Sequence, residues 1–188
     1  MIPRQKSALR SCVLTAALLF SLGALAQADD ADKNLNKPES PVVLPNPVTK
    51  NNLLSFYVSP TTSMDFAIDA KSVTVTDDGV VRFALIITSP SGANNISYEG
   101  IRCSSGEKKL YAIGQLNGSW SPARRDIWEP IFDHGSNRYH AALAKDYFCE
   151  SGVVAGKAEV ITERLRKKKI SDSFEYCPVI VSLKLDVK

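Results

Sequence analysis

The chain has 188 residues, with 23 Lys and Arg, 20 Asp and Glu, and a formal net charge of +3. Arg4, Lys6 and Arg10 account for this excess, and removing these three residues leaves 20 basic against 20 acidic residues. The rest of the chain is therefore neutral and lacks the basic footprint expected of a nucleic-acid-binding protein.

The first 28 residues have the pattern of a secretion signal. After the basic start, residues 12–26 are apolar, and Ala26-Gln27-Ala28 is the small-x-small pattern that a signal peptidase cleaves. A membrane-spanning helix needs about 20 apolar residues, so we interpret this shorter run as a signal rather than an anchor. We predict cleavage near Ala28, a periplasmic or secreted location in a bacterium, and no transmembrane segment in the mature chain.

Residues 29–50 have the composition of a Pro-rich linker. They combine Asp, Lys, Asn and Ser with prolines at positions 38, 41, 45 and 47, a mixture that stiffens the backbone and offers little apolar surface to bury. The remaining chain, about 140 residues, has the usual size of one domain. We predict a single domain over residues 51–169 and a strand-like tail over residues 170–188.

The predicted domain begins with strand and hairpin signals. A short apolar run at 56–58 and alternating Val and Thr at 73–76 precede Asp78-Gly79, a pair that favours a tight hairpin turn. The partner strand, residues 80–88, has apolar residues on both faces, which indicates a strand inside the sheet. The two faces carry Val81, Phe83, Leu85 and Ile87, and Val80, Ala84 and Ile86.

Two further strands extend this sheet. They are predicted at 94–103 and 108–116, with a turn at 104–106 between them and a strong hairpin signal at Asn117-Gly118 after them. Consecutive hairpins imply an antiparallel meander. The two sides of the first of these strands carry Ile96, Tyr98 and Arg102, and Ser97, Glu99, Ile101 and Cys103.

Two helices are predicted after an irregular loop that follows Trp120. Asn137 or Ser136 caps the first helix, and the second spans about residues 157–168, with acidic residues near its start and basic residues near its end. Strands followed by helices indicate the α+β class. We therefore predict an antiparallel meander sheet that is packed by C-terminal helices and held by one disulfide.

Export also sets the state of the cysteines. In an oxidising compartment, cysteines at the ends of a strand and a helix tend to pair, so we predict a disulfide between Cys103 and Cys149. The alternative is a zinc site that joins these two residues with His134 or His140. No Cys-x-x-Cys or His-x-x-x-His pair supports zinc, and we predict no metal site.

Cys177 is left without a predicted partner. It precedes a tail in which apolar and polar residues alternate over 179–187, as is typical of an edge strand. We expect this tail to complete the domain's own sheet. The alternative is self-association through Cys177 and residues 179–187.

Six short stretches form a distinctive pattern within residues 53–150. They are DGVVR at 78–82, SPSGA at 89–93, SYEGIRC at 97–103, WSPAR at 120–124, WEPI at 128–131 and AALAKDYFC at 141–149. Together they resemble the CNP-like family of exported bacterial proteins. The resemblance implies a cell-envelope protein of uncharacterised activity, and it assigns no catalytic residue or cofactor. The layout of strands, turns and cysteines also resembles, at the level of fold, the surface-adhesin E type of envelope domain.

Aromatic and basic residues suggest a binding site at one edge of the predicted sheet. Aromatic rings stack on sugars and Arg binds planar anions through two hydrogen bonds, so we expect an envelope protein or a glycan as partner. The alternative is that the tryptophans anchor a loop in the core and the arginines are solvated. The predicted binding residues are Tyr98, Glu99, Arg102, Trp120, Arg124, Arg125 and Trp128.

A small periplasmic hydrolase is the alternative function. Asp133, His134 and His140 would form its acid–base cluster, but no serine elbow, metal motif or phosphate-binding glycine loop accompanies them. We therefore predict an envelope binding or structural module without catalytic residues or cofactor. An open aromatic groove would favour binding, whereas a deep pocket at His134 or His140 would favour catalysis.

Overall fold

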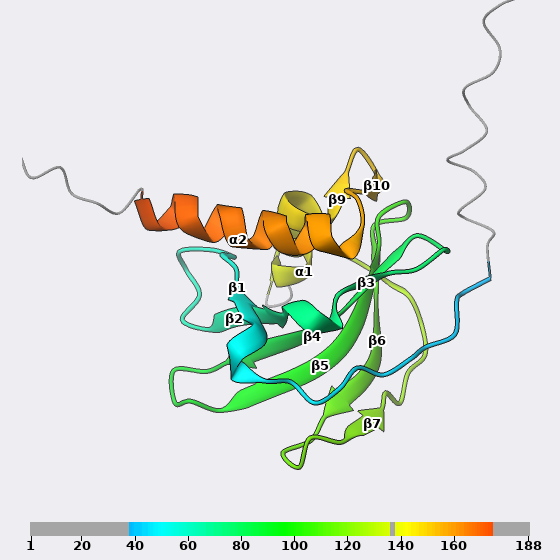
Figure 1. Cartoon of the computed structure of the whole chain (residues 1–188), viewed down its shortest axis with the longest axis horizontal. Helices are drawn as coiled ribbons and strands as arrows, with labels where there is room; N and C mark the ends of the chain where they lie inside the picture. The colour runs from blue at the N-terminus through cyan, green and yellow to red at the C-terminus, as the bar shows by residue number, and fades with distance from the viewer. Residues whose placement is uncertain (1–37, 136–137, 175–188) are drawn as a thin grey trace, which may run out of the picture. The chain divides into compact units, whose positions relative to one another are not determined.

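The computed structural model describes residues 38–135 and 138–174, with side chains as far as Lys167. The predicted signal and most of the predicted tail, including Cys177, lie outside the described residues. The described part consists mainly of antiparallel sheet and two α-helices, which confirms the predicted α+β class (Figure 1).

Eight strands form the main sheet, and a two-stranded sheet stands beside it. The strands are β1 (Leu53–Ser55), β2 (Asp65–Asp69), β3 (Thr74–Val75), β4 (Val80–Thr88), β5 (Asn94–Arg102), β6 (Glu107–Gly114), β7 (Trp120–Pro122) and β8 (Glu129–Pro130), with β9 (Cys149–Glu150) and β10 (Val153–Val154) in the small sheet. The main order is β1-β2-β4-β5-β6-β7, with β3 paired to β4 and β8 paired to β6. Every strand pairing among the described residues is antiparallel.

The predicted meander corresponds to β4, β5, β6 and β7. β4 has the predicted bounds, and the turn before it places Gly79 at a φ of 75°, a conformation that glycine adopts without strain. The run at 56–58, predicted as a strand, follows β1 instead. β2, which pairs with both β1 and β4, was not predicted.

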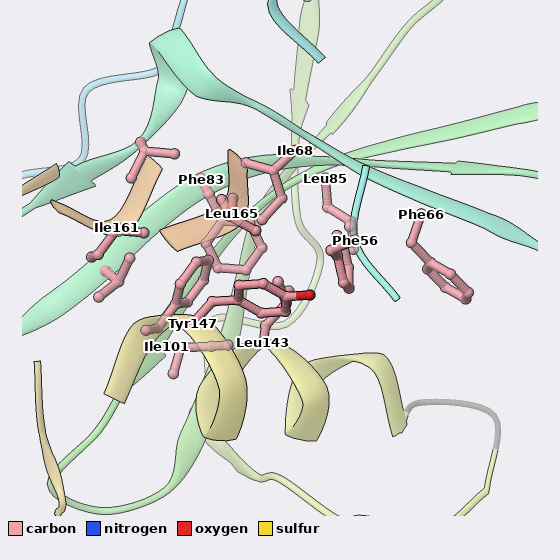
Figure 2. Close-up of a cluster of buried hydrophobic side chains, with 13 residues drawn as sticks. Phe56, Phe66, Ile68, Phe83, Leu85, Ile101, Leu143, Tyr147, Ile161 and Leu165 are labelled. Carbon is pink, nitrogen blue, oxygen red and sulfur yellow. The ribbon is translucent and has the colours of Figure 1, made fainter. Parts of the chain in front are cut away.

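The helices cover one face of the main sheet, which we call the helix face (Figure 1). They are α1 (Arg138–Leu143), continued by a π-helical turn (Ala144–Phe148), and α2 (Ala158–Phe174). Phe83, Leu143 and Leu165 are fully buried between the sheet and the helices (Figure 2). The rings of Phe83 and Phe148 meet edge to face with centroids 5.0 Å apart, so the π-helical turn is part of the core.

A disulfide joins the sheet to this helical layer. Cys103 follows β5, and Cys149 follows the π-helical turn and begins β9; their Cα atoms are 5.6 Å apart. The predicted pairing is therefore confirmed. The zinc alternative is wrong for these two cysteines, because each sulfur is bonded to the other.

The C-terminal helix is longer than the sequence analysis predicted. α2 continues to Phe174, so residues 170–174, which we predicted as the start of a strand-like tail, are helical. Within the described ranges, no helix combines the length and the apolar character needed to cross a membrane.

The opposite face of the sheet carries the N-terminal part of the described chain. Residues 38–48, which we call the arm, were predicted as the end of a linker, yet they lie across the sheet (Figure 1). Val48 packs against a second buried cluster, formed by Ala84, Tyr98, Tyr111 and Ala112. We call this side of the sheet the arm face.

Candidate functional site

The pleat of β5 separates the predicted binding residues between the two faces. Tyr98 lies on the arm face within the second buried cluster, whereas Glu99 lies on the helix face and contacts His140. A β-bulge shifts the β5–β6 register between these two residues. The residues predicted as one site therefore belong to different surroundings.

Tyr98 and Trp120, two of the predicted binding residues, lie close together on the arm face, and the arm contacts them. The Tyr98 ring lies 5.8 Å from the Tyr111 ring and 6.0 Å from the Trp120 ring, measured between centroids. The indole Nε1–H of Trp120 donates a 2.9 Å hydrogen bond to the carbonyl of Pro45 in the arm. These aromatic side chains are thus contacted by residues of the same chain.

Glu39 is the charged contact of the arm. Its Oε2 accepts a 2.8 Å hydrogen bond from Lys109 Nζ, and its Oε1 accepts a 2.7 Å hydrogen bond from the Tyr111 hydroxyl. The guanidinium of Arg82 lies 3.8 Å from the same Oε1. One carboxylate of the arm therefore meets two cations and a phenol of the sheet.

Arg82 binds the arm backbone in addition. Its Nη1 donates to the Pro41 carbonyl at 2.8 Å, and its Nη2 donates to the Ser40 carbonyl at 2.5 Å. Only 2% of the Arg82 side chain is exposed. Ser40 also donates from its backbone N and its hydroxyl to Asp78, at 3.1 and 3.0 Å. Because a buried charge needs hydrogen-bond partners, the arm compensates the burial of Arg82.

Gly100 leaves the space that the Tyr111 ring occupies. A Cβ at Gly100 would lie 2.8 Å from Tyr111 Cε2 and 3.0 Å from Val80 Cγ1, which is closer than side chains tolerate. The cationic groups of Arg82 and Lys109 lie 5.1 and 5.5 Å from the centroid of this ring. The absence of a side chain at Gly100 thus places the Tyr111 hydroxyl against Glu39.

We expect acid to weaken the attachment of the arm. Burial of the Glu39 carboxyl raises its pKa, but hydrogen bonds from Lys109 and Tyr111 and the charges of Lys109 and Arg82 together lower the pKa below the ordinary 4.5. A lowered folded-state pKa adds stability above the unfolded pKa, and that stability is lost as the pH falls through the folded-state pKa. Trp fluorescence of the wild type should therefore change as the pH falls below 4.5.

The matched variant for this titration is Glu39→Gln, which keeps the shape of the side chain and removes its charge. Its fluorescence should not show the step that titration of Glu39 causes in the wild type. An identical acid transition in the two proteins would contradict the assignment to Glu39.

Arg102 and Trp128 contact each other at the edge of the arm face. The Arg102 guanidinium lies 4.0 Å from the centroid of the Trp128 ring, and its Nη1 lies 3.7 Å from Glu107 Oε2. Lys109 pairs with Asp126 in the same loop. These contacts hold the loop before β8 against the sheet, although Trp128 is only partly buried.

An open groove lies on the helix face, along β6 and the loop that leads to β8. Its volume is about 570 Å³. Leu110, Ile113 and Ile127 supply apolar surface, and 47% of Ile113 is exposed. We call this hollow the β6 groove; its charged lining residues are Lys108, Arg124, Arg125 and Glu129.

An ion pair separates the β6 groove from a smaller neighbouring cavity. Lys108 Nζ lies 2.8 Å from Glu129 Oε2, and both residues line the two hollows. The neighbouring cavity has a volume of about 300 Å³ and extends to Phe132 and His140. A hydrogen bond from the ammonium of Lys108, and then the positive charge of Lys108, lower the pKa of Glu129. Glu129 therefore stays ionised and holds Lys108 at the junction.

The histidines predicted for a hydrolase lie in unlike surroundings. Asp133 and His134 are exposed and share a 3.2 Å hydrogen bond. His140 is 3% exposed and donates from Nε2 to Glu99 Oε2 at 2.6 Å, while the Ser97 hydroxyl donates to Glu99 Oε1 at 2.6 Å. Among the described residues, no group of three or more His, Cys, Asp and Glu side chains is gathered to hold a metal ion.

Several residues of the arm face and of the β6 groove were not predicted from the sequence. Arg82 interrupts an apolar strand whose two faces are covered, and a charge in that position signals a buried partner. Lys108 and Ile113 belong to a predicted strand, but nothing local shows that the loop after β7 encloses them. Of the predicted binding residues, Arg124 and Arg125 line the β6 groove.

Comparison with known proteins places these features in a family context. The model of the CNP1-like family matches residues 32–166, so the match includes the arm. Cryptic neisserial protein 1 of Neisseria gonorrhoeae is 28% identical over 113 residues, which cover 54% of this chain and 55% of that relative. The chain thus spans about half the length of the curated relative it matches. No solved structure matches the chain.

Proposed function

Because the chain belongs to the CNP1-like family, whose activity is uncharacterised, we propose a function from the surfaces of the molecule. The protein is an exported envelope module that binds an amphipathic anion in the β6 groove. The observation that carries this proposal is the combination of accessible aliphatic side chains with three cations and one acid around a single hollow. Ligand sites commonly join an apolar surface to a few charged groups that orient the ligand.

The charges of the groove favour a negatively charged head group. Lys108 and Arg125 share Glu129, at 2.8 and 3.7 Å, so two cations face one carboxylate. Within the described residues, no ion pair holds Arg124. A ligand with one carboxylate would reduce this excess of two positive charges to one, and an Arg guanidinium can bind that carboxylate through two parallel hydrogen bonds.

The apolar part of the ligand would contact Leu110, Ile113 and Ile127. Covering an exposed aliphatic side chain contributes about 25 cal/mol per Å² of apolar surface. A hydrocarbon or aromatic group joined to a carboxylate meets both requirements of the groove. The ligand class that we propose is therefore an amphipathic carboxylate.

Export is supported by two independent features. The first 28 residues follow the signal pattern, and Cys103 and Cys149 form a disulfide, a bond that persists in oxidising compartments. A hydrolase based on Asp133, His134 and His140 has less support, because two of these residues are exposed and the third is buried against Glu99.

Binding of dodecanoate to the mature protein tests the proposal. Ile113→Asp places a carboxylate on the apolar floor, and we expect it to weaken binding at least about tenfold, the equivalent of losing one aliphatic contact and adding repulsion. Calorimetric titration measures the change. The matched control is Leu116→Asp, since Leu116 is fully exposed and lies outside the groove.

The control variant should bind dodecanoate as the wild type does. Dodecanol, which has the same chain without the charge, should bind the wild type more weakly. Equal affinity of the two Asp variants would remove the groove from the proposal, and equal affinity for the acid and the alcohol would remove the role of the cations.

A further inference from the structure

We infer that the arm face is a recognition surface for an acidic, proline-flanked extended peptide, which the chain's own residues 38–48 fill in cis and the arm of a second copy can fill in trans. This surface is separate from the β6 groove, and the inference does not depend on the proposed ligand.

The contacts between the sheet and the arm resemble those between a receptor domain and a bound peptide. Among the described residues, the arm forms no strand pairing with the sheet, and the hydrogen bonds between them use side chains of the sheet. Trp120 donates to the carbonyl of Pro45, next to the rings of Tyr98 and Tyr111. Aromatic surfaces with such a donor recognise extended, proline-rich segments, whose stiffness lowers the entropy lost on binding.

Charge complementarity adds a second element of recognition. Lys109 and Arg82 are nearly buried cations, and the arm supplies the carboxylate of Glu39 and two backbone carbonyls to them. The Nε of Arg82 is buried without a hydrogen-bond partner in the described part of the chain. A segment bound on the arm face therefore needs a carboxylate near Lys109 and Arg82. A segment with a cation in place of Glu39 would bind more weakly.

The arm of a second copy has the same residues and can therefore make the same contacts with the arm face. The bonds between the arm and the sheet span 38 or more positions of sequence, so they do not require that the arm and the sheet belong to one chain. The arm joins the domain through the short 3-10 turn Lys50–Asn52, whose bonds are local. Exchange at this turn would give a reciprocal twofold pair in which each surface is completed by the partner's arm.

Two charge variants test this exchange. Glu39→Lys reverses the charge on the arm and leaves the arm face unchanged. Lys109→Glu reverses a charge on the arm face and leaves the arm unchanged. Neither variant can form the attractive contact within one chain or with its own copies. In a mixture, each arm meets an oppositely charged surface on the other variant, so we expect a pair of chains in light scattering after size exclusion. Each variant alone should have the mass of one chain.

The double variant Glu39→Lys with Lys109→Glu is the matched control. It restores attraction within the chain and should have the mass of one chain, both alone and mixed with the wild type. Single-chain mass in the mixture of the two single variants, with each unfolding cooperatively, would overturn the exchange.

A peptide experiment covers the case in which a charge reversal prevents folding. The probe is a synthetic peptide of residues 36–48, and its binding to the Glu39→Gln variant is followed through Trp fluorescence. The peptide is raised to millimolar concentration, so that it competes with the attached arm of the variant. We expect saturable binding, reduced at least about tenfold when the peptide carries Lys at position 39, because attraction becomes repulsion. Absence of binding would overturn the recognition surface. If the peptide binds but the folded Glu39→Lys and Lys109→Glu variants do not pair when mixed, the arm face binds such peptides but not the arm of a second copy, and the exchange is overturned.

Discussion

Replacing Cys103 and Cys149 together by serine is expected to lower the free energy of unfolding by about 4 kcal/mol. The two cysteines are 46 positions apart, and a cross-link over a loop of this length removes about that much loop-closure entropy from the unfolded chain. Domains are typically stable by about 5–15 kcal/mol, so the variant should lose a large share of its stability. The effect is large because the bond ties β5 to the π-helical turn that carries Phe148 into the core.

Urea unfolding of the oxidised wild type and the double serine variant measures this change. Cys177 is present in both proteins, so the difference between them reports on the pair alone. The wild type in reducing buffer should approach the midpoint of the variant. Equal midpoints in all three samples, or free thiols at both positions in exported protein, would contradict the structural role of the disulfide.

The sequence was most informative where structure depends on neighbouring residues. The Asp78-Gly79 turn and the apolar residues on both faces of β4 predict a hairpin without knowledge of distant contacts. The same holds for the start of α2, where Glu159 lies in the first turn as the helix dipole favours. The end of α2 at Phe174 was not predicted, and its last turn holds no basic residue. The disulfide was predictable because the signal-like pattern implied an oxidising compartment and the two cysteines lie at the ends of elements that pack together.

The arm could not be predicted because its contacts are distant in sequence. Its prolines and polar residues have the composition of a linker, and the residues that hold it, Arg82, Lys109 and Trp120, lie about 40 to 75 positions away. Missing β2 has a similar cause, since this strand is short and its partner β4 begins 11 residues after β2 ends. Composition describes a segment in isolation, whereas these segments acquire structure from partners.

The candidate site was predictable by residue type and less so by location. Tyr98 and Trp120 do form an aromatic surface, but only the path of the chain shows that the arm covers it. Alternation along β5 separates Tyr98 from Glu99, so the sequence already excluded a shared face. What the sequence lacked was the buried partner of Glu99, which comes from α1.

His140→Leu is expected to destabilise the domain by about 3–5 kcal/mol. The substitution leaves the Glu99 carboxylate, 8% exposed, with Ser97 as its hydrogen-bond partner on the sheet, and removing one member of a buried pair leaves an uncompensated polar group. Glu99→Leu combined with His140→Leu should recover most of this loss, because an apolar pair of similar volume replaces both groups. Urea unfolding of the four proteins gives the coupling energy between the two positions.

The matched control is His134→Leu, which removes the other histidine at an exposed position and should change stability by less than about 0.5 kcal/mol. A coupling energy near zero would show that the Glu99–His140 contact adds nothing to stability, and a catalytic use of His140 would then gain support. A large coupling energy would show that the pair stabilises the junction between β5 and α1. The Nε2 of His140 is then occupied by its hydrogen bond to the buried Glu99 carboxylate and is not available for proton transfer to a substrate.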